Sequence, residues 1–455
     1  MKAGVVAMVE LPKFIERGEI ARLIPVVADT SKENRAASIL LATLMSVENF
    51  RQALLESVGQ RVGSRAKIDC FTEVVFKGCL ADIKSRPDGL IWLRVGKRSW
   101  SALVEAKIGR AQMDEEQLKG YVQLAKRNGV NAVITVSNQF AALPTHHPVL
   151  LPKKSRPAVE LYHWSWMYVL TQATLLQAED EFDSPDQRYI LSEMVRYFKH
   201  NSAGVSSFDR MNPEWRDLVV KVQSGGSLNK TLPEVENTVA SWYQEQRDLC
   251  LIMSRELGRY VKLKLKKAHK DNPLRRLRDG CEELVKTAQL TCEMDVPDAA
   301  ATIEVTADLR TRHISCAMRL ASPRDRKKTS ARVNWLLRQI EKTEPENIFV
   351  KAIWPTKAQD TMASLAELRE DPAILQTDNQ SLAPKHLEVI MVRDLAGKFS
   401  GIKTFIEGVE AVVPRFYEQV GQHLRAWVPP PPKPREGVSA ELQAESAETP
   451  ETQIP

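Results

Sequence analysis

The sequence predicts an α/β protein in which a mixed sheet flanked by helices is followed by a separate α+β domain. Two apolar runs, 89–95 and 100–107, are separated by the polar turn GKRS, as is typical of an antiparallel hairpin. A helical pattern then leads to the apolar run NAVITVS, so a parallel strand is expected in the same sheet. Alternating strand-like runs farther along the chain indicate the second domain.

Composition sets broad limits on the function of this 455-residue chain. Its length suits two or three domains, and 43% hydrophobic with 27% charged residues is ordinary for a globular protein. A net charge of +6 is compatible with a nucleic-acid partner and does not require one. The six cysteines form no C-x-x-C pair, which argues against a zinc site and for reduced thiols.

Five parts are expected along the chain. Residues 1–30 are an N-terminal extension that the pattern does not interpret, and residues 31–222 form the first domain. The segment QSGGSLNKTLP (223–233) is the linker, and residues 234–427 form the α+β domain. The Pro- and Glu-rich tail, 428–455, is expected to be disordered. No long apolar run or signal-peptide pattern is found, so no membrane segment and a cytoplasmic location are expected.

The first domain is expected to open with a long helix that has Ser31 as its N-cap. Its apolar stripe comprises Leu40, Leu41, Leu44, Val47, Leu54 and Leu55. Glu48 interrupts this stripe, so it is either a boundary residue reaching to water or a candidate for the site described below.

The run FTEVVF (71–76) is expected to be a strand. Period-two alternation predicts one face made of Thr72, Val74 and Phe76 and an opposite face with Glu73 and Val75. Glu73 therefore faces either the site or solvent, and both alternatives remain open.

The hairpin that follows brings acidic residues together. Gly96 can adopt the positive φ that a two-residue turn requires at its first central position. With the turn centred after Gly96, Asp88 lies opposite Glu105, with Cβ atoms about 5 Å apart. Lys107 falls on the same face as these carboxylates, and Ala106 on the other.

Two carboxylates and an ammonium on one sheet face indicate a metal site. Like charges this close repel, and oxygen-rich pairs of this kind hold Mg²⁺ or Mn²⁺ in proteins. A divalent ion beside a lysine suits phosphodiester hydrolysis, because the ion activates water and the lysine stabilises the transition state. An ordinary hairpin with exposed charges is the alternative.

Pro87-Asp88 followed by Glu105-Ala106-Lys107 closely resembles the signature of the PD-(D/E)XK nuclease superfamily, whose restriction-endonuclease-like core is a mixed sheet flanked by helices. Gln117 and Tyr121 resemble the Q-x-x-x-Y helix of many members. The order TEVVF, RPDGLI, EAK, QL..Y, ITVSN is similar to a bacterial subgroup described as stress-response proteins. The resemblance spans residues 31–220, so it implies nothing about the C-terminal half.

The resemblance implies roles for single residues. Asp88 and Glu105 would be metal ligands together with the Ala106 carbonyl, and Lys107 would orient water and stabilise charge. Glu73 and Gln117 are supporting candidates for catalysis, and Tyr121 is a candidate for contact with nucleic acid. Glu48 enters because a first-helix glutamate often approaches the metal in this superfamily.

Further helices and strands complete the first domain. The run GRAQMDEEQLKGYVQLAKRNG (109–129) predicts the crossover helix, with Asp114 and the glutamates in its N-terminal turn and Lys126 and Arg127 in its last. The run VELYHWSW predicts a strand before a helix at 165–178, and residues 186–209 predict another helix.

The second domain is expected to begin with one helix from residue 234 to 269. The densest basic cluster lies at the end of this predicted helix and just after it: Lys262, Lys264, Lys266, Lys267, Lys270, Arg275, Arg276 and Arg278. This cluster predicts either a sequence-independent nucleic-acid contact or a solvated helix end. The rest alternates strands (ATIEVTADL, HISCAMRLA, NIFVKAIW, HLEVIMVRD) with helices (RVNWLLRQIEK, DTMASLAELRE, 402–427).

The expected function is that of a metal-dependent nuclease acting on nucleic acid, with DNA favoured over RNA. Its C-terminal domain would serve binding or homo-oligomer assembly. The alternatives are a catalytically silent nuclease-fold module that binds nucleic acid or a protein partner, and a stress-response protein whose active unit is the C-terminal half.

Overall fold

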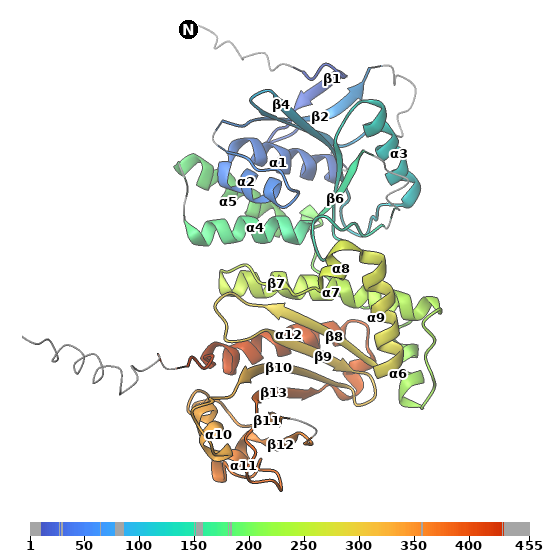
Figure 1. The fold of residues 1–455 in the computed structure, drawn as a ribbon. Coiled ribbons are helices and arrows are strands. Elements are labelled where there is room, and N and C mark those ends of the chain that lie inside the picture. Colours follow the sequence, from blue (N-terminus) through green and yellow to red (C-terminus); the bar gives the residue numbers. More distant parts are fainter. Residues whose placement is uncertain are drawn as a thin grey trace, which may run out of the picture.

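In a computed structural model the chain forms two halves, each built on one sheet (Figure 1). The structure describes residues 11–26, 28, 31–63, 65–77, 86–149, 151, 158–180, 182, 184–355, 358–429 and 431. Most of the predicted 428–455 tail therefore lies outside the described residues. No helix in these ranges is both long and apolar enough to cross a membrane.

The first half contains a six-stranded mixed sheet with the strands in sequence order. Its strands are β1 (Ile15–Ile20), β2 (Lys67–Phe76), β3 (Gly89–Val95), β4 (Arg98–Ala106), β5 (Ala132–Ser137) and β6 (Glu160–Ser165). Neighbours from β1 to β4 are antiparallel, and β4, β5 and β6 are parallel. The predicted mixed sheet is thus confirmed. The N-terminal extension, for which no structure is predicted, supplies the edge strand β1.

The hairpin register is the one that the turn predicts. Gly89 pairs with Val104, and the ladder continues to Val95 opposite Arg98. Gly96 has a φ of 60°, the left-handed conformation that its turn position requires. Extending this register by one pair places Asp88 opposite Glu105.

Helices cover both faces of this sheet. One face packs against α1 (Lys32–Ser46), α2 (Glu48–Glu56), α4 (Trp166–Glu179) and α5 (Pro185–Lys199), and the other against α3 (Glu115–Arg127). The long helix predicted from Ser31 is wrong in one respect, because extended backbone at Val47 divides it into α1 and α2. Ser31 stands at the N-cap, but its side chain makes no capping hydrogen bond.

The second half contains a seven-stranded antiparallel sheet in the order β12-β11-β13-β10-β9-β8-β7. Its strands are β7 (Lys262–Leu263), β8 (Gln289–Asp295), β9 (Ile303–Asp308), β10 (His313–Ala321), β11 (Ile348–Ile353), β12 (Thr361–Ser364) and β13 (His386–Asp394). Its helices are α6 (Trp215–Gln223), α7 (Pro233–Leu257), α8 (Lys267–Asp271), α9 (Pro273–Thr287), α10 (Thr329–Leu337), α11 (Leu365–Glu370) and α12 (Thr404–Gln419).

Three details of this half differ from the sequence analysis. The helix predicted for 234–269 ends at Leu257, because Gly258 adopts a left-handed φ of 61°. The run DTMASLAELRE begins as strand β12 and becomes helical only at Leu365. Helix α6, assigned by sequence to the first domain, packs in the second core, where Trp215 contacts Phe405.

Candidate active site

The predicted acidic pair lies where β4 ends and β3 begins. The Oδ2 atom of Asp88 accepts a hydrogen bond from the backbone N–H of Ala106 at 2.7 Å. The backbone of Lys107, the residue after Ala106, is held as well, because the indole N–H of Trp166 donates to the Lys107 carbonyl at 2.9 Å. Asp88 and the end of β4 are therefore held together by contacts beyond the strand ladder.

Glu105 is the most buried of these charged groups, at 3% exposed. Its Oε1 atom accepts hydrogen bonds from the Lys107 ammonium at 2.8 Å and from the Gln117 amide at 3.2 Å. Its Oε2 atom is buried and has no partner of good hydrogen-bond geometry. The nearby Tyr121 hydroxyl interacts with the carboxylate and acts to lower the pKa of Glu105. Gln117 reaches it from the first turn of α3, where the N-cap Asp114 accepts the Gln117 N–H at 2.6 Å.

Tyr121, one turn farther along α3, lies next to Glu105. Its hydroxyl donates to the Arg86 carbonyl at 3.3 Å, and its side chain is almost fully buried. Burial and the neighbouring Glu105 charge raise the pKa of Tyr121. The predicted contact between Tyr121 and nucleic acid is not supported, because its ring packs in the core under α3.

Burial and mutual repulsion perturb both carboxyl groups. Burial and the Glu105 charge raise the pKa of Asp88 to about 8. Burial raises the pKa of Glu105, although the Lys107 ammonium opposes this shift. Burial alone would lower the pKa of Lys107, but the hydrogen bond that its ammonium donates to the Glu105 carboxylate, together with the Glu105 charge, outweighs burial and raises the pKa. A pair of acids held this close at neutral pH favours either a shared proton or a cation.

A glutamate of the first helix does approach this site, but it is Glu33 and not the predicted Glu48. Glu33 accepts the Ile108 N–H at 3.3 Å, and its second oxygen lies 3.9 Å from the Lys107 nitrogen. Glu48 instead lies 3.9 Å from Arg51, and its N–H donates to Gln187. The available signal was the position of Glu33 in the first turn of a helix, where acidic side chains are favoured.

Glu73 occupies a β-bulge that the alternation rule missed. Its φ is 52°, and β2 carries one extra residue against β1 at this point. Phe71 and Val74 consequently pack in the same core, which contradicts the predicted face shared by Thr72 and Val74. The Glu73 carboxylate accepts from the Asn34 amide at 3.3 Å, so it contacts α1.

The side chains present fit a divalent cation held by few protein ligands. Nowhere in the described ranges do three His, Cys, Asp or Glu side chains converge as a metal cluster. A cation here would therefore rest on Asp88 and Glu105, with the Ala106 carbonyl and water as further ligands, as Mg²⁺ commonly accepts. The buried Oε2 of Glu105, which has no partner of good hydrogen-bond geometry, is the observation that supports this fit.

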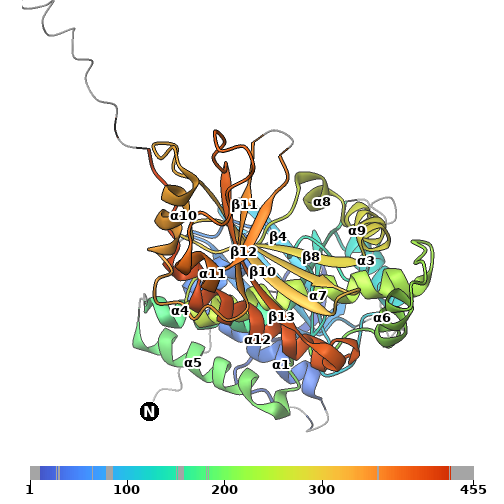
Figure 2. The same ribbon diagram turned by 90° about the horizontal axis from the view of Figure 1, so that it is seen from below.

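The predicted basic cluster is divided among β7, α8 and α9, not carried on one helix end. Lys262, Lys266, Lys267 and Arg275 are exposed, and the exposed Lys264 pairs with Glu293 at 2.8 Å. Helices α8 and α9 lie on the same side of the molecule as α3 in both views (Figures 1 and 2), and the His146 ring contacts the Lys270 carbonyl at 2.9 Å.

Arg276 does not belong to this basic surface. It is 6% exposed, its guanidinium donates to Gln246 at 2.6 Å, and it stacks 3.7 Å from the centre of the Tyr243 ring. The prediction that Arg276 contacts nucleic acid is therefore wrong, because α9 turns this side chain into the protein.

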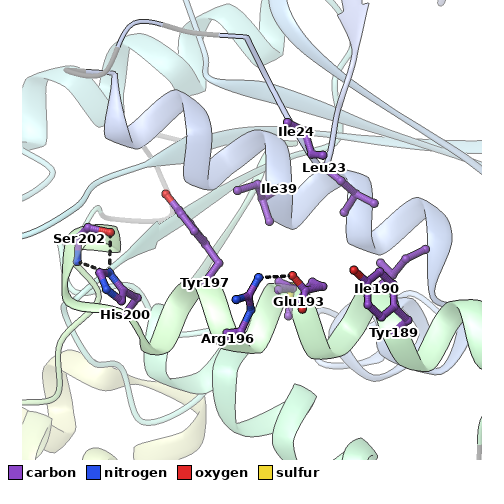
Figure 3. Close-up of a pocket in the computed structure, with 11 residues that line it drawn as sticks. Leu23, Ile24, Ile39, Tyr189, Ile190, Glu193, Arg196, Tyr197, His200 and Ser202 are labelled. Atoms are coloured by element: carbon purple, nitrogen blue, oxygen red, sulfur yellow. Dashed lines mark hydrogen bonds and ion pairs between the residues drawn. The ribbon is translucent and has the colours of Figure 1, made fainter.

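An apolar groove of about 460 Å³ lies between α1 and α5 (Figure 3). Ile39 of α1 and Tyr189 and Tyr197 of α5 line it, with Ile24 at its rim. None of the predicted catalytic residues lines this groove.

No protein-family model, curated protein or solved structure matches the chain.

Proposed function

We propose that this protein is a divalent-metal-dependent nuclease of the PD-(D/E)XK type that hydrolyses phosphodiester bonds, with DNA favoured over RNA. The observation that carries the proposal is Glu105, whose Oε1 is held by Lys107 and Gln117 while its buried Oε2 has no partner of good hydrogen-bond geometry. A buried acceptor without such a partner is costly, which supports a ligand at this position.

Each residue then has a definite task. A bound Mg²⁺ or Mn²⁺ would supply Lewis acidity and lower the pKa of a water. Asp88 and Glu105 provide the anionic oxygens, and the Ala106 N–H keeps Asp88 in place. The Lys107 ammonium can orient an attacking water and stabilise the charge that develops on the phosphate. Gln117 fixes the orientation of Glu105.

A second candidate function is a nuclease-like module that binds nucleic acid or a protein partner without cutting. The observation that favours it is the absence of a third converging acidic ligand in the described part of the chain. The intact set of acid, acid and lysine favours the enzyme, because two buried carboxylates beside one another would be costly in a silent scaffold.

The decisive experiment is a cleavage assay with purified protein on single- and double-stranded DNA and RNA, in Mg²⁺, Mn²⁺ or EDTA. We expect cleavage of at least one substrate that stops in EDTA and in Asp88→Ala. Wild-type protein that cleaves nothing would favour the binding module. Cleavage that persists in Asp88→Ala would locate the activity elsewhere.

A further inference from the structure

A cleft of about 720 Å³, lined by both polar and apolar groups, lies between the two halves. The first half contributes residues 109–112 and 138–139 to it, and α7 contributes Ser241 and Gln244. The connecting segment 204–213 completes the wall. The second half thus forms part of a cavity that begins in the loop directly after β4.

The cleft adjoins the acidic site through a braced loop. Gly109 stands two residues after Lys107, so their Cα atoms are at most about 7.6 Å apart. The Asn138 amide donates to the carbonyls of Gly109 at 3.0 Å and Gly204 at 2.8 Å. The Phe140 N–H of the first half donates to the Gln244 side chain of α7 at 3.2 Å. These hydrogen bonds hold the walls without any ligand.

The lining suits nucleotides more than a plain phosphate backbone. Most of its polar side chains are neutral amides and hydroxyls, the groups that read base edges and sugars. Arg210 is paired with Asp209 at 2.6 Å, whereas Arg110 is exposed and is in none of the ion pairs found within the described ranges. Phe208 is half-buried, lines the wall and makes an edge-to-face contact with the Phe140 ring.

Asn212 adds an acceptor that lacks a donor. Its amide nitrogen donates to the Glu214 carboxylate at 2.9 Å and to the Thr238 hydroxyl at 3.1 Å. Because a carboxylate only accepts, this fixes which amide atom is oxygen. That oxygen is buried without a partner, although Asn212 lines the cleft. Base amino groups and ribose hydroxyls are donors of the required kind.

We propose, on the basis of the proposed nuclease function, that this cleft holds the unpaired nucleotides that flank the scissile phosphate. The substrate is therefore single-stranded nucleic acid or a single-stranded end. The cleft volume is in the range of small-ligand sites, about 300–1,000 Å³. This volume suits a few unpaired nucleotides and is small for a base-paired duplex, whose major groove alone is about 12 Å wide.

The test measures binding in EDTA, by fluorescence anisotropy, to single-stranded DNA, single-stranded RNA and duplex DNA of equal length. Ser207→Trp fills the cleft from an exposed position, and Arg110→Ala removes its unpaired cation. Ser227→Trp and Arg216→Ala change exposed residues outside the cleft and serve as matched controls.

We expect wild type to prefer single strands, Ser207→Trp to weaken that binding about tenfold or more, and Arg110→Ala about threefold. Both controls should bind within about twofold of wild type. Comparison of the DNA and RNA arms identifies the sugar that the cleft prefers. Unchanged single-strand binding by Ser207→Trp, or equal wild-type affinity for duplex, overturns the inference.

The result is separable from the fate of the nuclease itself. Loss of cleavage in Asp88→Ala together with unchanged binding in Ser207→Trp would reject the proposed role of the cleft and support the nuclease function. Weakened binding in Ser207→Trp without any cleavage by wild type would support nucleic-acid binding in the cleft and reject the nuclease function.

Discussion

The carboxylate of Asp88 accepts the backbone N–H of Ala106 at 2.7 Å, which ties the start of one strand to the end of the next. Because of this contact, a substitution at Asp88 can remove the negative charge while keeping the hydrogen bond. An asparagine keeps an oxygen for the Ala106 N–H but removes the negative charge that a cation needs. We expect Asp88→Asn to stay folded, to lose Mn²⁺ binding in calorimetry and to lower metal-dependent cleavage about 10³-fold. Cleavage near the wild-type rate would contradict the assignment of Asp88 as a ligand.

Lys107 should affect the rate of cleavage and not the affinity for metal. Its ammonium hydrogen-bonds Glu105 at 2.8 Å, and its side chain is only 14% exposed. Lys107→Ala removes the group that acts on water and on the transition state, so single-turnover cleavage should fall about 10²–10³-fold. Calorimetry with Mn²⁺ should still show binding. Loss of both properties together would mean that Lys107 mainly holds Glu105 in place.

Glu33 and Glu48 form a matched pair, because both open a helix but only Glu33 lies near Lys107. We expect Glu33→Gln to lower cleavage about tenfold, since it removes a charge close to the lysine. Glu48→Gln should cleave at the wild-type rate, with equal thermal stability of the two variants as the control. If Glu48→Gln lowered cleavage and Glu33→Gln did not, the sequence-based choice of Glu48 would be correct.

The basic surface and Arg276 should respond differently to substitution. Replacing the exposed Lys266, Lys267 and Lys270 by glutamate should weaken nucleic-acid binding for all sequences and flatten its dependence on salt. Arg276→Ala should instead lower the free energy of unfolding by about 1–3 kcal/mol, because it loses Gln246 and the Tyr243 ring. Titrations at several salt concentrations and urea unfolding measure the two effects. A triple variant that binds as wild type would leave the lysines as solubilising surface.

Glu245 should make stability depend on pH. It is fully buried on α7 and both of its carboxyl oxygens lack a partner. Burial, with the charges of Asp248 and Glu410, raises the pKa of Glu245 well above its usual value. Burial likewise raises the pKa of Asp248 to about 6 and that of Glu410 to about 7.

The sign follows from proton binding. Because the folded protein binds these protons more tightly than the unfolded chain, stability falls as pH rises from about 4 through the folded-state pKa values. Glu245→Gln is neutral at every pH, so it should flatten this fall and gain about 1 kcal/mol or more at pH 8. Urea unfolding at pH 5 and pH 8 measures the effect, with the exposed Glu344→Gln as control. A variant less stable than wild type at pH 8 would show that a charged Glu245 is stabilised there.

Local sequence was sufficient for the centre of the candidate site. The register of β3 and β4 follows from the short turn at Gly96, and period-two alternation then places Glu105 and Lys107 on one face. The crossover from β4 through α3 to β5 is equally local, because a capped amphipathic helix between two apolar strands has few alternatives.

Features that depend on packing between distant segments could be seen only in the tertiary structure. The bulge at Glu73 depends on pairing with β1, a strand that the pattern of residues 1–30 did not reveal. Arg276 was basic in sequence, yet α9 buries it because Gln246 and Tyr243 of α7 offer it partners.

By itself, the sequence determined the hairpin that carries Asp88, Glu105 and Lys107, because turn geometry and strand period act over neighbouring residues. Only the tertiary structure selected Glu33 over Glu48 and opened a cleft between the two halves. Those features depend on where α1 and α7 dock on distant strands. Docking depends on the sum of many weak packing contacts, which no short stretch of sequence encodes.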